Sequence, residues 1–349
     1  MEIRRDENGN PRKAPFSLQM DLSKFNAAMF EKATDEEKSQ QDVMSESTTF
    51  FKDGMRKLFR NPLAVGSIIV LSLILLIIIF APLFVPYSYE EILSVDGVRD
   101  KGAKNLAPFT YSRLEQQYIE AGGTRFPHIF GTDEQCRDYF IRVIYGTRVS
   151  LVVEFFASII VLIIGMLYGS ISGYLGGKVD LIMMRIVDII SSVPSMLYVI
   201  LLMVVLHSQS LLNVFLVIGM TGWLGMARLV RTQVMSLKER EFILAAKVSN
   251  VSNLKLITKH LIPNSFGPIV VSMTLSIPSA IFLEASLQFL GLGIAAPMPS
   301  WGGLAQEGIT ALRTFPHLMW IPSVFISVTI LAFNFLGDAM RDALDPTQK

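Results

Sequence analysis

The sequence predicts an all-α polytopic membrane protein with six transmembrane helices, on the basis of its composition and its apolar windows. Of the 349 residues, 51% are hydrophobic and 17% are charged, and the mean hydropathy is +0.45. An ordinary soluble domain is less apolar and more charged. A helix needs about 20 mostly apolar residues to cross a hydrocarbon core of about 30 Å. The windows that reach or approach this length are residues 65–85, 149–171, 181–206, 211–227, 266–290 and 318–337.

The Lys and Arg residues outside these windows predict the orientation. Six crossings place both ends of the chain on one side, and the segments on that side hold more than twice as many Lys and Arg residues as the others. Because segments rich in these residues stay in the cytoplasm, both termini are predicted to be cytoplasmic. Window 65–85 is long enough to remain as a membrane anchor, so we expect no cleaved signal peptide.

The composition along the chain suggests five divisions. Residues 1–48 are polar and lack sustained periodicity, which is typical of a tail. Residues 87–147 are too polar to insert and long enough for a small ordered cap, whose fold the sequence does not indicate. The expected divisions are a cytoplasmic tail (1–48), an interfacial helix with the first span (49–86), an extracytoplasmic segment (87–147), a core of five spans with a cytoplasmic loop at 228–265 (148–340), and a cytoplasmic end (341–349).

Signatures of catalysis are missing. A phosphate-binding loop needs Gly, four residues, then Gly-Lys-Ser/Thr. The nearest stretch, SGYLGGKV, fails at Ser172 and at Val179. The four His residues show no i, i+4 pair, there is no Gly-x-Ser-x-Gly elbow, and Cys136 is the only cysteine. We therefore expect a chain that is not an enzyme and that holds no metal or cofactor of its own.

Charged residues inside the windows are candidates for function, because a charge at the bilayer centre costs at least about 2.5 to 3.5 kcal/mol. Glu284 is the deepest of them, and Asp188 and Glu154 lie nearer the ends of their windows. Glu284 could be the carboxylate of an ion-coupled carrier, or it could pair within the bundle or line a conduit. We favour the second interpretation, and we consider Glu284 and Asp188 as conduit or interface residues.

The loop at 228–265 is too long for a simple turn. Its sequence favours helix from Arg231 through Lys247, with no Pro or Gly. Asn250 suits a left-handed turn residue, and Ser252 can cap a second helix that we expect Pro263 to stop. The basic residues of this helix-turn-helix element could meet lipid headgroups, but lipid contact does not account for its paired alanines or its compact turn.

The stretch LAAKVSNVSNLKLITKHLIPN, residues 244–264, resembles the cytoplasmic EAA loop of ABC importer permeases. The family pattern is Glu-Ala-Ala, three residues, Gly, nine residues, then Ile-x-Leu-Pro. Leu244 stands at the motif Glu and Asn250 at the motif Gly, and Glu241 lies one helical turn earlier, where it can supply a carboxylate. The coupling residues that the resemblance implies are Glu241, Leu244, Ala245, Ala246, Asn250, His260, Pro263 and Asn264.

Other stretches resemble the C-type permease subunit of oligopeptide and dipeptide importers. They include FFKDGMRKLFRNPLAVGSIIV, FGTDEQCRDYFIRVIYGTRVSL, GYLGGKVDLIMMRIVDIISSVPSML, FLEASLQFLGLGIAAPMPSWGGL and FNFLGDAMRDALDP. These blocks extend from residue 50 to the carboxyl end of the sequence, and Cys136 replaces a commonly small residue.

This resemblance implies a type I ABC importer permease fold with a cytoplasmic coupling helix, in the cytoplasmic membrane of a bacterium. The implied partners are a second homologous permease, two ATPase subunits that bind ATP and Mg, an extracytoplasmic peptide-binding protein and the lipid bilayer, without nucleic acid. The alternatives are an ABC importer permease for another solute such as nickel, an ion-coupled secondary carrier that uses Glu284, and a membrane scaffold that transports nothing.

Overall fold

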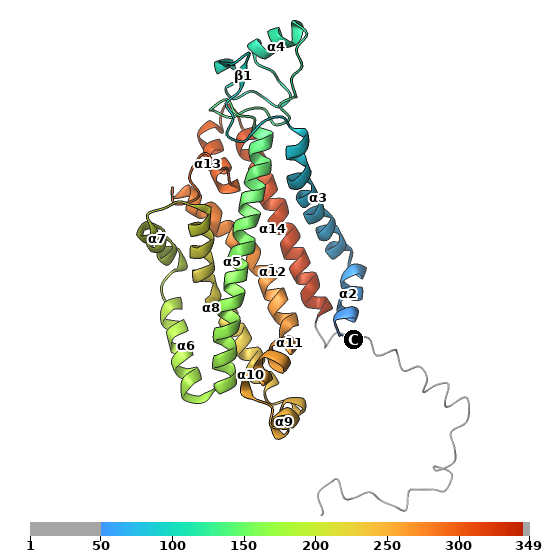
Figure 1. Ribbon diagram of the computed structural model, residues 1–349, viewed down its shortest axis with the longest axis vertical. Helices are drawn as coiled ribbons and strands as arrows, with labels where there is room; N and C mark the ends of the chain where they lie inside the picture. The colour runs from blue at the N-terminus through green and yellow to red at the C-terminus, as the bar shows by residue number, and fades with distance from the viewer. Residues whose placement is uncertain (1–49, 345–349) are drawn as a thin grey trace, which may run out of the picture. The chain divides into compact units, whose positions relative to one another are not determined.

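The computed structural model describes residues 50–344, and the predicted tail and the last five residues lie outside them. Five helices in this part are long and apolar enough to cross a membrane (Figure 1). They are α3 (Pro62–Phe84), α5 (Tyr139–Leu175), α8 (Leu211–Leu237), α12 (Phe266–Phe289) and α14 (His317–Ala343). A sixth crossing is possible if α6 (Gly177–Ser191) and α7 (Ser195–Leu206) act as one bent span. The predicted all-α membrane fold is therefore confirmed.

Short elements precede and connect the long helices. They are α2 (Phe50–Arg60), β1 (Ser94–Val95), β2 (Val98–Arg99), η4 (Lys101–Ala103), α4 (Arg113–Glu120), α9 (Glu241–Val248), α10 (Asn253–Lys255), the π-helix η5 (Leu256–Leu261), α11 (Ile262–Asn264) and α13 (Trp301–Ala311). At one end of the bundle lie α13 and the segment with β1 and α4, and at the other lie α9 to α11 (Figure 1).

The window at 181–206 is not one straight span, which corrects the prediction. Its helix stops after Ser191 and resumes at Ser195, and the two parts bend by 82°. Pro194 explains the break, because proline has no amide hydrogen and disfavours helical backbone in Val193, the residue before it. The side chain of Ser192 donates its hydroxyl to the carbonyl of Ile189 at 2.7 Å, which closes the end of α6.

Two other spans are longer than predicted. Helix α5 begins at Tyr139 rather than at 149, because Asp138 caps it by accepting the amide hydrogen of Ile141 at 3.0 Å. Helix α8 runs to Leu237 rather than to 227, so the helix predicted from 231 to 247 is divided between α8 and α9. A hydropathy window locates the apolar part of a helix, and it does not detect polar turns that extend the helix at either end.

The closest packing in the bundle is between α5 and α8, and it depends on glycine. Gly165, Gly169 and Gly173 recur every fourth residue on the face of α5 that meets α8. A Cβ atom on Gly169 would lie 2.4 Å from the carbonyl oxygen of Ala227. Small residues at this spacing let two membrane helices approach closely. The two helices therefore form a closely packed pair, against which α12 also packs, while α14, among the spans, packs mainly on α12 and α3.

The segment between α3 and α5, residues 85–138, folds into a small cap, with the β1–β2 hairpin and α4. Its fully buried His128 donates Nδ1–H to Asp138 at 2.7 Å and Nε2–H to Glu115 at 3.0 Å. Burial by itself lowers the pKa of His128, but the hydrogen bonds to the two carboxylates outweigh it and raise that pKa to about 9. A charged imidazolium thus joins α4 to the start of α5 at neutral pH.

Candidate functional site

Helix α9 presents an apolar face to solvent at the end of the bundle opposite the cap (Figure 1). Ile243 is fully buried and anchors the helix in a cluster with residues of α5, α8 and α12. Leu244 and Val248, which share one side of the helix at i, i+4 spacing, are 48% and 90% exposed, and Phe242, on another side, is 43% exposed. Burying exposed apolar area is favourable by about 25 cal/mol per Å². Helix α9 is therefore suited to docking against another surface while it stays attached to the spans.

The turn after α9 confirms the conformation predicted for Asn250, whose φ is +58°. Asn tolerates this left-handed region better than most residues other than Gly, so it can occupy the position of the motif Gly. The amide hydrogens of Asn250 and Val251 donate to the carbonyls of Lys247 at 3.0 Å and Ala246 at 3.2 Å. These bonds reverse the chain directly after α9.

The second arm of the loop differs from the prediction at both ends. Ser252 lies at the N-cap position, but its side chain makes no capping hydrogen bond. The start of this arm is held to α5 instead, because Tyr174 donates its hydroxyl to the side chain of Asn253 at 2.6 Å. Pro263 does not stop the helix: it lies in α11, which follows the π-helix η5 without a break.

The predicted coupling residues therefore fall on two arms. Glu241, Leu244 and Ala245 are exposed on α9, and Ala246 is half-buried beside them. The other arm holds the half-buried His260 and the exposed Pro263 and Asn264, and the side-chain amide of Asn264 donates to the carbonyl of His260 at 2.6 Å. Helix α9 contacts η5, so the arms form one element.

Sequence reasoning missed the polar contacts that fix the loop to the spans. Arg231, in the last turns of α8, donates two hydrogen bonds to Asp180 of α6, at 2.5 and 2.6 Å. Ser172 of α5 donates to the same carboxylate at 2.6 Å, and Lys238 donates to the carbonyl of Gly173 at 3.0 Å. These residues are far apart in the sequence, and only Asp180 in the first turn of α6 gives a local signal, as an acidic residue at a helix N-terminus.

Asp188 lies at the surface of the chain, beside the break between α6 and α7. Arg228 donates to its carboxylate at 3.1 Å, and the side chain of Asp188 is 55% exposed and that of Arg228 46%. Arg228 also donates to the hydroxyl of Ser191 at 2.9 Å, and Ser191 lines a cavity of about 350 Å³ formed by the break and α8. The exposed ion pair and the cavity are adjacent on one face.

Glu284, the conduit or interface candidate, has no exposed surface in this structure and lies within the bundle. Ser150 of α5 donates its hydroxyl to Glu284 at 3.3 Å and accepts the amide hydrogen of Trp301 at 3.1 Å. Glu154 lies one turn along α5 from Ser150 and is also buried. Among the described residues neither oxygen of Glu154 has a hydrogen-bond partner. The deepest charges thus belong to the packed interior.

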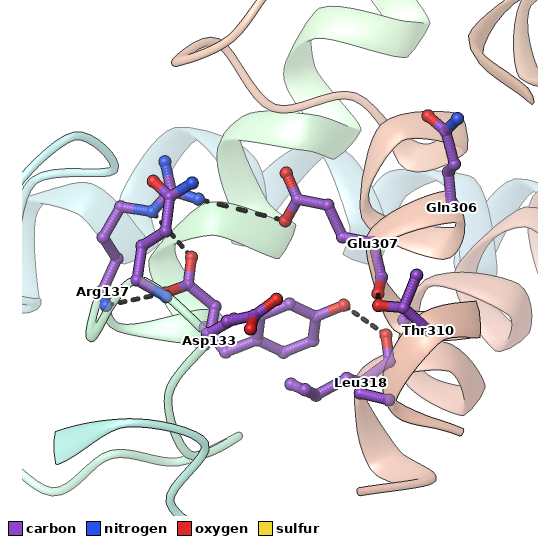
Figure 2. Close-up of a pocket in the computed structure, with 11 residues that line it drawn as sticks. Asp133, Arg137, Gln306, Glu307, Thr310 and Leu318 are labelled. Carbon is purple, nitrogen blue, oxygen red and sulfur yellow. Dashed lines mark hydrogen bonds and ion pairs between the residues drawn. The ribbon is translucent and has the colours of Figure 1, made fainter. Parts of the chain in front are cut away.

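A second cavity, of about 330 Å³, lies where the cap meets α13 and the start of α14 (Figure 2). Asp133 of the cap accepts hydrogen bonds from Arg137 Nε and Arg142 Nη1, both at 2.6 Å. Arg142 also donates to Glu307 of α13 at 2.7 and 3.2 Å. This network connects the cap to α13. Within residues 50–344 no group of three His, Cys, Asp or Glu side chains is placed to hold a metal ion.

A comparison with protein families matches residues 165–349, more than half of the chain, to the binding-protein-dependent transport system inner membrane component. The chain belongs to this family. A second family model, the N-terminal TM domain of oligopeptide transport permease C, matches residues 49–119. The family supplies the membrane component of its transport systems, and ATP hydrolysis takes place in a separate subunit.

Similar curated proteins cover nearly the whole chain. The oligopeptide transport system permease protein OppC of Bacillus subtilis (strain 168) is 41% identical over 320 residues, which are 91% of this chain and 96% of that protein. The dipeptide transport system permease protein DppC of the same organism is 40% identical over 305 residues, which are 87% of this chain and 88% of that protein. OppC of Escherichia coli (strain K12) is 41% identical over 304 residues, covering 87% and 93%. The predicted resemblance to peptide-type permeases is confirmed.

Among solved structures, the methionine ABC transporter MetNI in an inward-facing conformation gives a TM-score of 0.46 at 16% identity. The aligned part is 58% of this chain and 96% of that chain.

Proposed function

We propose that this chain is the transmembrane permease subunit of an ATP-driven importer that takes up oligo- or dipeptides delivered by an extracytoplasmic binding protein. The family match and the OppC and DppC relatives support the permease function and the choice of peptide over nickel. The observation that carries the mechanism is α9, an anchored helix with an exposed apolar face at one end of the spans.

Helix α9 transmits movement from the ATPase subunit to the spans in this mechanism. Its exposed side chains dock on an ATPase subunit, and closure of the ATPases on ATP displaces the helix. Ile243 passes the displacement to the cluster of α5, α8 and α12, because packed side chains resist independent movement. Leu244 makes an apolar contact where the family pattern has Glu, and Glu241 supplies the carboxylate one turn earlier.

The remaining partners follow from the same assignment. A second homologous permease pairs with this chain, and two ATPase subunits, which hold ATP and Mg, bind on the cytoplasmic side. Both termini are cytoplasmic, with the cap outside. Asp188 and Arg228, charged and half-exposed in membrane-spanning helices, face the conduit or the paired permease, because exposing them to lipid would be costly.

The buried position of Glu284 supports a packing function over ion coupling. A coupling-ion carboxylate must meet water during transport, whereas Glu284 is enclosed by Ser150 and the start of α13. Replacing Glu284 with Gln keeps its size and its ability to accept from Ser150. We expect the variant to retain ATP-dependent uptake, and a loss of uptake without loss of assembly would favour the carrier.

Copurification tests the proposed assembly. The chain is isolated from native membrane in mild detergent, and its partners are identified by mass spectrometry. We expect ATPase subunits with phosphate-binding loops, a second permease and a peptide-binding protein. Recovery of the chain without an ATPase, under conditions that keep a known importer intact, would contradict the proposal and support the scaffold.

A further inference from the structure

The cavity between the cap and α13 contains a buried arginine, Arg137, whose outer edge makes one long ion pair and no hydrogen bond within the described residues. Arg137 is only 4% exposed, and its Nε donates to Asp133 at 2.6 Å. Within the described residues, neither of its two Nη groups donates a hydrogen bond, and Nη2 lies 3.9 Å from Glu307. Figure 2 shows Arg137 directed from the cap toward Glu307 of α13.

Neighbouring groups form no hydrogen bond with this edge, because their own hydrogen bonds are already made. Glu307 is held by Arg142 through two hydrogen bonds. Asp133 accepts from both arginines and from the backbone amides of Gln135 and Arg137, at 2.8 Å each. Buried polar groups normally find partners, and a guanidinium edge with two parallel N–H donors fits one carboxylate in a bidentate contact.

The charges around the cavity restrict the ligand. Arg137 and Arg142 are balanced by Asp133 and Glu307, and Glu134 at the rim is partly offset by Lys104 at 3.0 Å. A multiply charged anion such as phosphate would therefore face several carboxylates with no surplus of positive charge. A single peptide carboxylate suits the cavity better, because it brings one negative charge to Arg137, and in a short peptide the ammonium group can also face Glu134 or the half-exposed Glu307.

We propose that this cavity is a receiving subsite for the carboxyl-terminal end of a peptide, with Arg137 binding the terminal carboxylate. The proposal rests on the proposed function as a peptide permease. The volume of about 330 Å³ is at the lower end of the range of small-molecule sites, which begins near 300 Å³. A cavity of this size holds the end of a peptide rather than a long chain. The subsite therefore binds the terminal carboxylate, a group that all linear peptides share.

Uptake of a free peptide acid and of its carboxyl-terminal amide tests this subsite. The complete importer, with saturating binding protein, is reconstituted in proteoliposomes, and the acid-to-amide uptake ratio is measured for the wild type and for Arg137→Gln. Any preference of the binding protein itself is the same in both and cancels. We expect the ratio to fall about tenfold, which corresponds to about 1.4 kcal/mol. Arg137→Lys keeps the charge but loses the bidentate guanidinium edge, so its acid-to-amide ratio should lie between those of the wild type and Arg137→Gln.

The matched control is Arg313→Gln, which removes an exposed arginine just after α13 and outside the cavity lining. It should leave the ratio unchanged. An Arg137 variant that only misfolds, or that only weakens docking of an acidic loop of the binding protein, lowers both uptake rates equally. An unchanged ratio in Arg137→Gln would therefore overturn the subsite.

A binding measurement decides the case if a variant has no uptake. Saturation-transfer NMR on the importer in nanodiscs, without binding protein, compares a dipeptide with its amide. We expect stronger saturation of the acid, lost in Arg137→Gln and kept in Arg313→Gln, and equal saturation of acid and amide would overturn the proposal. Wild-type importer that takes up neither peptide would instead refute the proposed function, and the NMR comparison would still decide the subsite.

Discussion

Truncation of Val248 to Ala should weaken the docking of the ATPase about tenfold. Val248 is 90% exposed on α9, so nearly all of its side chain is available for burial by a partner. The substitution removes two methyl groups, each worth about 0.8 kcal/mol on burial, and the sum of about 1.6 kcal/mol exceeds the roughly 1.4 kcal/mol that corresponds to a factor of ten in affinity. Ala is a better helix former than Val, so α9 itself is not weakened.

The assay is a titration of the purified ATPase subunit onto the permease in nanodiscs, with the Kd read by biolayer interferometry. Val205→Ala is the matched control, because Val205 is 60% exposed on α7, outside the loop. We expect its Kd to equal that of the wild type. An unchanged Kd for Val248→Ala, or an equal loss in both variants, would refute the assignment of the apolar face of α9 as the docking surface.

Four further predictions concern the elements that hold this surface and the cap. Asn250→Val should uncouple ATP hydrolysis from uptake while Asn250→Gly keeps both coupled, because a β-branched residue at a φ of +58° is strained by about 1 to 2 kcal/mol. His128 should stabilise the cap fully below its unfolded pKa of about 6.5 and progressively less as pH rises through about 9, seen as faster amide exchange in the cap that His128→Gln shows already at neutral pH. Asp180→Asn should lower the free energy of unfolding by about 1 to 3 kcal/mol, measured as a lower Tm in detergent, because Arg231 loses a charged hydrogen-bond partner. Gly169→Ala should separate α5 from α8 and also lower the Tm, since its Cβ would lie 2.4 Å from a backbone oxygen of α8, and an unchanged Tm would contradict this packing.

The local features of the fold could be predicted from the sequence. The apolar windows located the spans because hydropathy is a property of each segment alone. Asn250 was placed in a left-handed turn for a reason internal to that residue, and φ is +58°. The bend at Pro194 was also readable in principle, because proline breaks a helix whatever surrounds it, but the long apolar window at 181–206 concealed it.

The contacts between distant segments could not be predicted in this way. Arg142 and Glu307 are 165 positions apart, and nothing near either residue indicates the other. The same holds for Asp180 and Arg231, and for the enclosure of Glu284 by Ser150. Burial depends on the tertiary packing of helices, so a charge in an apolar window marks a residue that needs a partner without saying where the partner lies.

ATP-dependent peptide uptake tests the central claim most directly. The copurified complex is reconstituted in proteoliposomes with ATP enclosed, and entry of a labelled peptide is followed with the binding protein present or absent and with an ionophore that removes ion gradients. The account predicts uptake that requires both ATP and the binding protein and that persists with the ionophore. Uptake that proceeds without ATP and stops when the gradient is removed would contradict it.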